Sequence, residues 1–168
     1  IGWDYDFDKA VTADTTITAK WEKEVYKITY DPNGGTILNE ADKYKTVSYG
    51  DTYGQLLDKD KVSRSGFTFL GWTTVKDDAS TQVKSTDKYT ANTDSTLYAL
   101  WDASKVAVTY HANGGTVKDD DENSITSEYI NYESSVTREA EKENLVFEGW
   151  YLDEALTEKY NDEPVTEN

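Results

Sequence analysis

One block of sequence occurs twice in this chain, 80 positions apart. Residues Ile28–Thr36 and Val108–Thr116 share the pattern aliphatic-Thr-Tyr-X-X-Asn-Gly-Gly-Thr. Each block is followed, in the same order, by a short β-branched segment and by a Phe-X-Gly-Trp motif that ends at Trp72 or Trp150. This self-similarity constrains the fold strongly, because each copy must bury its own hydrophobic face or share one with a neighbouring copy.

The repeat pattern predicts three segments. Residues 1–22 are expected to end a preceding repeat, because Thr16–Trp21 is similar to Thr96–Trp101. Residues 23–102 are expected to form one complete repeat. Residues 103–168 are expected to form a further repeat that lacks its last strand.

The residues of each repeat predict a β-rich module. Tyr26, Ile28 and Tyr30 alternate with polar residues, which is typical of a strand with one buried face. The segment 33–35 (Asn-Gly-Gly) supplies residues that tolerate positive φ, as tight hairpin turns require. Further strands of the complete repeat are expected in three segments: residues 46–49, 67–69 and 96–101.

A short helix is expected between the second and third strands of each repeat. Residues 54–62 have helical character, and so do the Glu- and Lys-rich residues 135–144 of the next repeat. Both segments are too short to be stable alone and would need a sheet to pack on. A helix crossing one face of a mixed sheet predicts a small α+β module.

The charge and composition exclude several classes of function. The formal net charge is -16, from 33 acidic and 17 basic residues, and there is no cysteine. A polyanionic surface repels nucleic acid and anionic membranes. Disulfides and thiolate metal sites are excluded, and no stretch approaches the roughly 20 apolar residues of a membrane helix. The sequence predicts no nucleic-acid partner and no membrane insertion.

The candidate metal ligands are His111 and an acidic run, residues 119–123. A single histidine builds neither a catalytic triad nor a histidine metal cluster, so His111 is interpreted as a solvated loop residue. The acidic run offers oxygen ligands of the kind that calcium takes, but it lacks the ligand spacing and central glycine of an EF-hand. It is interpreted as a solvated loop, with calcium as the alternative.

The repeated tryptophans Trp72, Trp101 and Trp150 are candidates either for the core or for a binding platform. A residue that recurs at equivalent places is expected to fill the core of each repeat, and a sugar- or protein-binding platform is the alternative. The Asn-Gly-Gly turns lack the lysine and following helix of a phosphate-binding loop. Carboxylate pairs are abundant, but small repeats offer no deep pocket. We predict no catalytic residue, no cofactor and no metal site, and hence no enzyme.

Three motifs in the same order carry a resemblance to a known family. Tyr30–Thr36, Gly66–Trp72 and Thr96–Trp101 resemble the Listeria–Bacteroides repeat, a family that includes the B repeat of the internalins. The resemblance covers nearly the whole chain, although His111-Ala112 replaces Asp-Pro in the last copy. It implies a β-grasp-like, ubiquitin-like fold in tandem copies, and an extracellular bacterial protein at the cell surface or cell wall.

Two hypotheses for function follow. The first is a stalk or spacer module that also makes adhesive or protein contacts, multiplied by copy number. The second is a dedicated adhesin that binds a glycan or a host receptor through variable loops, such as residues 73–86 and 118–124. The unmatched ends predict, in addition, head-to-tail self-association in which Thr15–Trp21 completes the last repeat of another molecule. An intramolecular Lys–Asn isopeptide bond, which needs a buried lysine and a catalytic acid, is left open.

Overall fold

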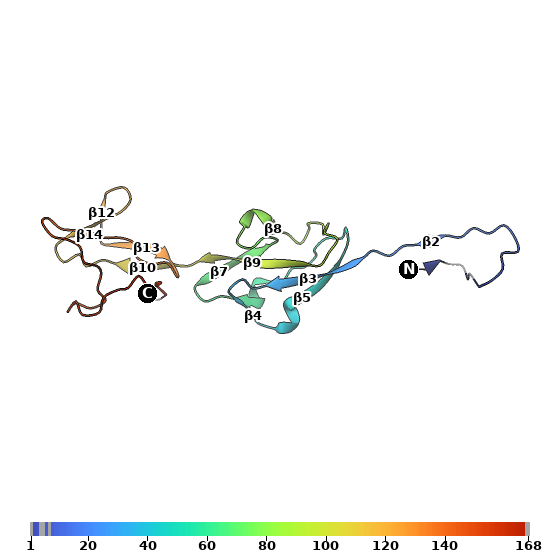
Figure 1. The fold of residues 1–168 in the computed structure, drawn as a ribbon, viewed down its shortest axis with the longest axis horizontal. Coiled ribbons are helices and arrows are strands. Elements are labelled where there is room, and N and C mark those ends of the chain that lie inside the picture. Colours follow the sequence, from blue (N-terminus) through green and yellow to red (C-terminus); the bar gives the residue numbers. More distant parts are fainter. Residues whose placement is uncertain (1, 4–5, 7, 167–168) are drawn as a thin grey trace. The chain divides into compact units, whose positions relative to one another are not determined.

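The computed structural model describes residues 2–3, 6 and 8–166 and is rich in β-strands (Figure 1). The β-rich fold class predicted from the repeats is confirmed. Its helical content consists of three short 3-10 turns: η1 (Glu40–Lys43), η2 (Lys59–Lys61) and η3 (Ala79–Thr81). Within the described residues, no helix has the length and apolar character needed to cross a membrane.

The chain forms two compact units. The first contains residues Ile1–Val62 and Gly71–Leu100, and the second contains residues Ser63–Leu70 and Trp101–Asn168. The first unit is built on a five-stranded sheet with the order β5-β3-β9-β7-β8 (Figure 1). The strands of this sheet are β3 (Val25–Asp31), β5 (Tyr44–Ser48), β7 (Phe67–Thr73), β8 (Gln82–Val83) and β9 (Ser95–Ala103).

Strand β3 lies between β5 and β9 in this sheet. It pairs with β5 in antiparallel orientation, with Tyr26 opposite Val47, and with β9 in parallel orientation, with Tyr30 opposite Leu97. The alternation of Ile28 and Tyr30 with polar residues places these two side chains in the core, where they are 0% and 2% exposed. The strand predicted from the two-residue period is confirmed.

The Asn-Gly-Gly turn adopts the expected backbone, but it does not close a hairpin. Asn33 and Gly34 have φ values of 46° and 83°, and the Gly35 N–H donates to the Pro32 carbonyl at 2.9 Å. Two consecutive positive φ values define a type I′ turn. The next strand, β4 (Thr36–Ile37), pairs with β6 (Val62–Ser63) instead of β3. The turn therefore does not close a tight hairpin, but the strand predicted at residues 46–49 does pair with β3, as β5 in antiparallel orientation.

The helix predicted for residues 54–62 is also wrong. Only η2 forms there, and residues 54–58 before it belong to no helix or strand, with Leu57 bonded to two side chains of the sheet. The Leu57 N–H donates to the Tyr30 hydroxyl at 3.2 Å, and the Leu57 carbonyl accepts from Trp72 Nε1 at 2.7 Å. These bonds hold the peptide groups that a helix would have paired internally. The counterpart predicted for residues 135–144 is not helical either, and it contains β14 (Ala140–Glu141).

The second unit contains two smaller sheets. Strands β10 (Lys105–Thr109) and β13 (Ser127–Asn131) form an antiparallel pair. Strand β11 (Thr116–Lys118) lies between β12 (Ser124–Ile125) and β14. The core of this unit includes Val106, Tyr110 and Val117, which are 2–6% exposed. The ring of Phe67, from the part of β7 that belongs to this unit, lies edge-on to Tyr132 at 5.7 Å.

The N-terminal segment carries a separate pair of short strands. Strand β1 (Gly2–Trp3) pairs with β2 (Ala19–Lys20) in antiparallel orientation. Within this segment, Val11 and Trp21 are 61% and 82% exposed. Trp21 therefore lies in solvent, although its counterpart Trp101 is half-buried.

The side chain of Asn33 connects its turn to the rest of the first unit. Its Nδ2 group donates to Asp77 Oδ1 at 2.6 Å and to the Ala99 carbonyl at 3.0 Å. We expect Asn33→Ala to lower the free energy of unfolding by about 1–3 kcal/mol, because the Ala99 carbonyl loses the donor of a buried hydrogen bond and Asp77 loses its partner. Urea unfolding would measure the change. The control is Asn113→Ala, because Asn113 has a similar φ of 51° but an exposed side chain. Equal losses in the two variants would contradict the role of these hydrogen bonds.

Candidate functional site

The three repeated tryptophans have different environments. Trp72 is 1% exposed and fills the core of the first unit, where its ring lies 4.6 Å from that of Tyr30. This confirms the core role predicted for Trp72. Trp101 is half-buried, edge-on to Phe69 at 5.4 Å. Trp150 is half-buried too, and it lines an open cavity of about 840 Å³ in the second unit.

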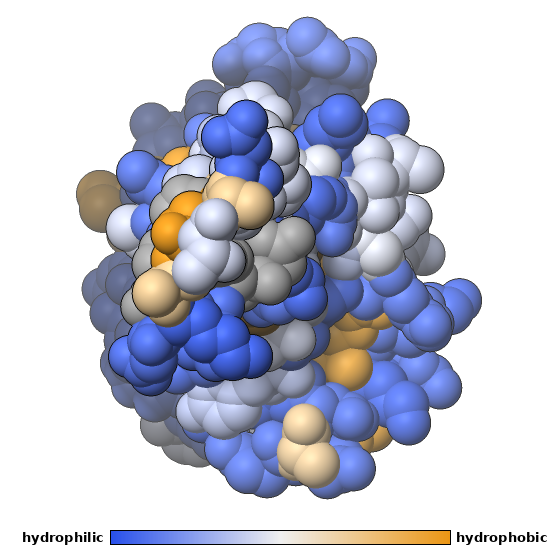
Figure 2. Space-filling model, turned by 90° about the vertical axis from the view of Figure 1, so that its right-hand side faces the viewer, coloured by the Kyte–Doolittle hydropathy of each residue, from blue (hydrophilic) through white to orange (hydrophobic). Residues whose placement is uncertain are grey.

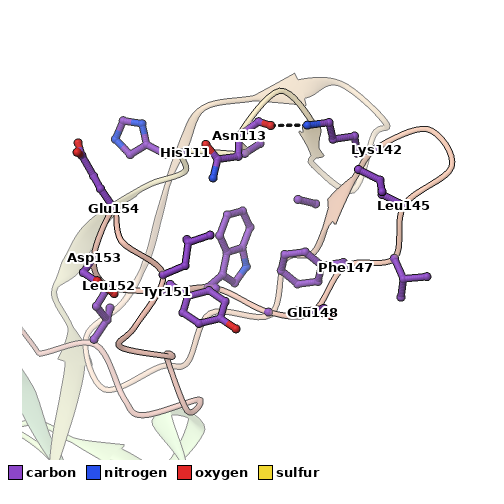
Figure 3. A pocket seen from close by; sticks show the side chains of 16 residues that line it. His111, Asn113, Lys142, Leu145, Phe147, Glu148, Tyr151, Leu152, Asp153 and Glu154 are labelled. Atoms are coloured by element: carbon purple, nitrogen blue, oxygen red, sulfur yellow. Dashed lines mark hydrogen bonds between the residues drawn. The ribbon is translucent and has the colours of Figure 1, made fainter.

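We call this cavity the Trp150 cleft and define it by its apolar lining residues Leu145, Val146, Phe147, Trp150 and Leu152. Figure 3 shows Leu145 and Lys142 on one side of the cleft, with His111 and Glu154 on the opposite side. Three of the five apolar side chains are strongly exposed: Leu145 at 64%, Val146 at 89% and Leu152 at 66%. Large apolar side chains gathered in one open cavity are the usual mark of an interaction surface.

The aromatic floor of the cleft repeats the core of the first unit. The rings of Tyr110 and Trp150 lie 5.0 Å apart, as those of Tyr30 and Trp72 lie 4.6 Å apart. Trp150 Nε1 donates to the Arg138 carbonyl at 2.7 Å, just as Trp72 Nε1 donates to the Leu57 carbonyl. The two repeats thus build the same aromatic pair, but in the second repeat only Tyr110 is buried, at 6% exposed, whereas Trp150 is half-buried and lines the cleft.

The polar rim of the cleft is occupied by structural hydrogen bonds. Lys142 Nζ donates to the Asn113 carbonyl at 2.7 Å (Figure 3). The Asp153 carboxylate accepts from the backbone N–H groups of Glu158 and Thr157 at 2.7 and 2.9 Å. The hydrogen bond from Glu158 is the main reason that the pKa of Asp153 lies below its usual value. This carboxylate holds a turn and stays ionised, so it is a poor general acid at neutral pH.

His111 is exposed and lies at the rim of the cleft. The structure therefore places it in a loop after β10, as interpreted from the sequence. Its imidazole faces the same side of the cleft as Glu154 (Figure 3). Among the described residues, no group of three or more histidine, aspartate or glutamate side chains is arranged to hold a metal ion.

The acidic run at residues 119–123 forms the turn between β11 and β12. Asp119 Oδ1 accepts from the Asn123 N–H at 2.8 Å, and this bond is the main cause of its lowered pKa. Asp120 pairs with Arg138 at 2.6 Å, and Glu122 pairs with Lys118 at 3.1 Å. These carboxylates point to different partners and do not converge on one point.

Sequence reasoning missed the half-buried ion-pair cluster around Arg138. Arg138 Nε lies 3.3 Å from Glu128, with both side chains about one-fifth exposed, and Glu128 accepts from the Tyr110 hydroxyl at 2.5 Å. Burial and this bond to Glu128 raise the pKa of Tyr110. Only the rarity of arginine in the chain, at positions 64 and 138, offered a signal in the sequence.

One lysine and one asparagine side chain meet across a strand pair. Lys105 Nζ donates to Asn131 Oδ1 at 2.5 Å, and both side chains are exposed. An isopeptide bond forms between buried partners next to a carboxylic acid, and this pair has no such burial. The contact is a cross-strand hydrogen bond.

Burial of the Tyr30 hydroxyl raises its pKa to about 12, opposed by the hydrogen bond from Leu57. The folded state therefore favours the neutral phenol, whose pKa is about 10 in an unfolded chain. Stability from this group is complete below pH 10 and is lost as the pH rises from 10 towards 12. We expect the free energy of unfolding to fall by about 2 kcal/mol across this range. Urea unfolding of wild type and of Tyr30→Phe at each pH would measure this fall. If the free energy of unfolding depended on pH identically in the two proteins, the role of Tyr30 would be contradicted.

Two tandem, β-rich repeats with matching aromatic pairs and Asn-Gly-Gly turns define this chain as a tandem repeat protein. The sequence profile of the Listeria–Bacteroides repeat domain matches residues 26–100 and 107–168, so the chain belongs to this family. Repeats of this family are found in bacterial surface proteins.

Two curated relatives come from the bacterium Evansella cellulosilytica. One, provisionally named a Gly-rich membrane protein, is 30% identical over 94% of this chain and 17% of its own length. Another, provisionally named a membrane protein, is 31% identical over 90% of this chain and 21% of its own length. The chain thus spans about a fifth of the length of these relatives. No solved structure matches it.

Proposed function

We propose that the chain is a non-catalytic tandem repeat module of a bacterial cell-surface protein, acting as a stalk or spacer and as a protein-interaction module. The observation that carries this proposal is that one aromatic and turn framework is built twice in a single chain. Tyr30–Trp72 and Tyr110–Trp150 are matching pairs, and their indole N–H groups are both bonded to backbone carbonyls. These side chains support the fold of each repeat.

We further propose that the repeat has a β-grasp-like architecture without the usual helix. In the order β5-β3-β9-β7-β8, the first and last long strands, β3 and β9, form a parallel pair, flanked by β5 on one side and by β7 and β8 on the other. The proposed repeat boundaries are residues 1–22, 23–102 and 103–168. The family matches at 26–100 and 107–168 support the last two boundaries.

An extracellular location at the cell surface or cell wall is part of the same proposal. The names of the relatives favour the cell envelope. The net charge of -16 keeps an exposed array soluble. Figure 2 supports this, because the face that it shows is mostly hydrophilic, with small separate hydrophobic areas.

Protease treatment of intact bacteria that carry the parent protein would test the location. We expect antibodies raised against this chain to bind intact cells, and external protease to remove that signal. A signal that appears only after lysis would overturn the proposal. Deleting residues 23–102 from the parent protein would test the spacer role, because the portion beyond the repeats should lose exposure to antibody while the protein level stays the same.

A second candidate is a dedicated adhesin that binds a glycan or a host receptor. Its support is that both variable loops are held in shape: the Asn33 side chain binds the loop at residues 73–86 through Asp77, and Asp119 binds Asn123 within the loop at residues 118–124. Preorganised loops lose less entropy on binding. Glycan arrays and host-protein binding assays at high concentration would test this candidate, and blank results in both would remove it.

A further inference from the structure

We propose that the turn at Asn113–Gly114 is a self-modification site, where Asn113 loses its side-chain amide to water with assistance from Lys142. The sequence contains two Asn-Gly pairs, Asn33–Gly34 and Asn113–Gly114. Both pairs have positive φ values in the same kind of turn, but the two asparagine side chains have different environments. This inference goes beyond the proposed surface role, because it assigns a covalent reaction to one repeat.

The reaction is the conversion of asparagine to aspartate or isoaspartate. Solvent base removes the proton of the Gly114 N–H, and the nitrogen attacks Cγ of Asn113. A C–N bond forms, the bond from Cγ to Nδ2 breaks, and Nδ2 takes up a proton and leaves as ammonia. Water then opens the resulting five-membered succinimide at either of its two carbonyl groups. Glycine at the second position favours the attack, because it has no side chain to shield the nitrogen.

Both reacting groups of the Asn113–Gly114 pair are accessible. The two residues are exposed. Among the residues that the structure describes, no group is hydrogen-bonded to the Asn113 side-chain amide or to the Gly114 N–H. The side chain can therefore rotate towards the nitrogen, and both solvent base and water can reach the turn.

Lys142 contacts the peptide group that supplies the nucleophile. Lys142 Nζ donates to the Asn113 backbone carbonyl at 2.7 Å (Figure 3). This carbonyl and the Gly114 nitrogen belong to one conjugated peptide unit. When the nitrogen loses its proton, much of the negative charge therefore lies on the carbonyl oxygen that Lys142 already contacts. A cation held where charge develops lowers the barrier to the reaction.

The matching asparagine of the first repeat is held in place. Asn33 is 7% exposed, and its Nδ2 group donates to Asp77 and to the Ala99 carbonyl. These two bonds fix the amide that would have to leave, and burial restricts the access of water. Reaction at Asn33 therefore requires local opening of the turn. The chain thus carries its own reference site for the same Asn-Gly sequence.

The modification changes the second repeat where the space is smallest. An isoaspartate adds one carbon to the main chain, next to Gly115. A Cβ atom on Gly115 would already lie 2.7 Å from the Glu141 carbonyl oxygen and 3.1 Å from that of Ala112. The longer backbone cannot keep the 2.9 Å bond from the Gly115 N–H to the Ala112 carbonyl without displacing this turn. Since β11 begins at Thr116, its pairing with β14 should loosen.

Incubation of the full chain at mildly alkaline pH, followed by peptide mass spectrometry, would test the reaction. We expect Asn113 to convert at least about 10-fold faster than Asn33, because only Asn33 must first open its turn. Incubation in ¹⁸O-labelled water should place the label at residue 113. Hydrogen exchange should become faster at residues 116–118 and 140–141 in the modified protein.

Three variants test the role of Lys142. We expect Lys142→Met to slow conversion of Asn113 by about 3- to 10-fold, less than the roughly 100-fold typical of a water-excluded donor, because this site is exposed. Lys142→Arg keeps the positive charge and the donor, so it should convert at nearly the wild-type rate. Lys159→Met is the matched control, since it removes the same charge from an exposed lysine elsewhere in the second unit.

Three outcomes would overturn the proposal. The first is that Asn33 converts as fast as Asn113. The second is that the Lys142→Met and Lys159→Met variants convert Asn113 at equal rates. The third is that Lys142→Arg is as slow as Lys142→Met.

Discussion

Trp72→Ala is expected to lower the free energy of unfolding of the first repeat by about 3–5 kcal/mol. The side chain is 1% exposed, so its removal leaves a cavity next to Tyr30 and deprives the Leu57 carbonyl of its donor. A loss of this size is a large part of the stability of a small domain. Urea unfolding would measure the loss of stability, and peptide-resolved hydrogen exchange over residues 25–48 would show that it occurs in the first repeat.

The matched variant is Trp150→Ala, at the equivalent position of the second repeat. Because Trp150 is half-buried over an open cleft, we expect a smaller loss of about 1–3 kcal/mol, measured over residues 105–131. Trp21→Ala should be nearly neutral in the monomer, since that ring is 82% exposed. If Trp150→Ala destabilised its repeat as much as Trp72→Ala, the cleft would be closed in solution.

The predictable parts of this fold were those that depend on local chemistry. The alternation of Tyr26, Ile28 and Tyr30 fixed a strand because its period of two matches a pleated sheet. The Asn33–Gly34 pair predicted positive φ values because few other residues tolerate them. The buried position of Trp72 was predicted from its repetition, although Trp101 and Trp150, predicted in the same way, are only half-buried. Each of these inferences needed only a few consecutive or equivalent residues.

The errors arose where long-range partners decided the outcome. The helix expected at residues 54–62 does not form, because the backbone of Leu57 bonds instead to the side chains of Tyr30 and Trp72, which are distant in sequence. The tight hairpin expected at the Asn-Gly-Gly turn does not form because β4, directly after the turn, pairs with β6, although the strand predicted at residues 46–49 does pair with β3. The cluster of Arg138, Glu128 and Tyr110 had no local signal.

Leu97→Ala is expected to destabilise the first repeat by about 2–5 kcal/mol. Leu97 is 0% exposed on β9 and lies opposite Tyr30 in the parallel register. Its truncation would leave a cavity between β3 and β7, where a rigid sheet cannot collapse fully. The loss should be visible in urea unfolding and as faster hydrogen exchange along β3 and β9. An effect below about 1 kcal/mol would mean that β9 is not the central element of this core.

The informative comparison is Ile17→Ala, at the position that matches Leu97 in the N-terminal segment. Ile17 is not part of the hydrophobic core, so we expect its truncation to change the free energy of unfolding by less than about 0.5 kcal/mol. Urea unfolding of both variants would measure the difference, and a loss for Ile17→Ala as large as that for Leu97→Ala would show that Ile17 is as deeply buried in solution as Leu97.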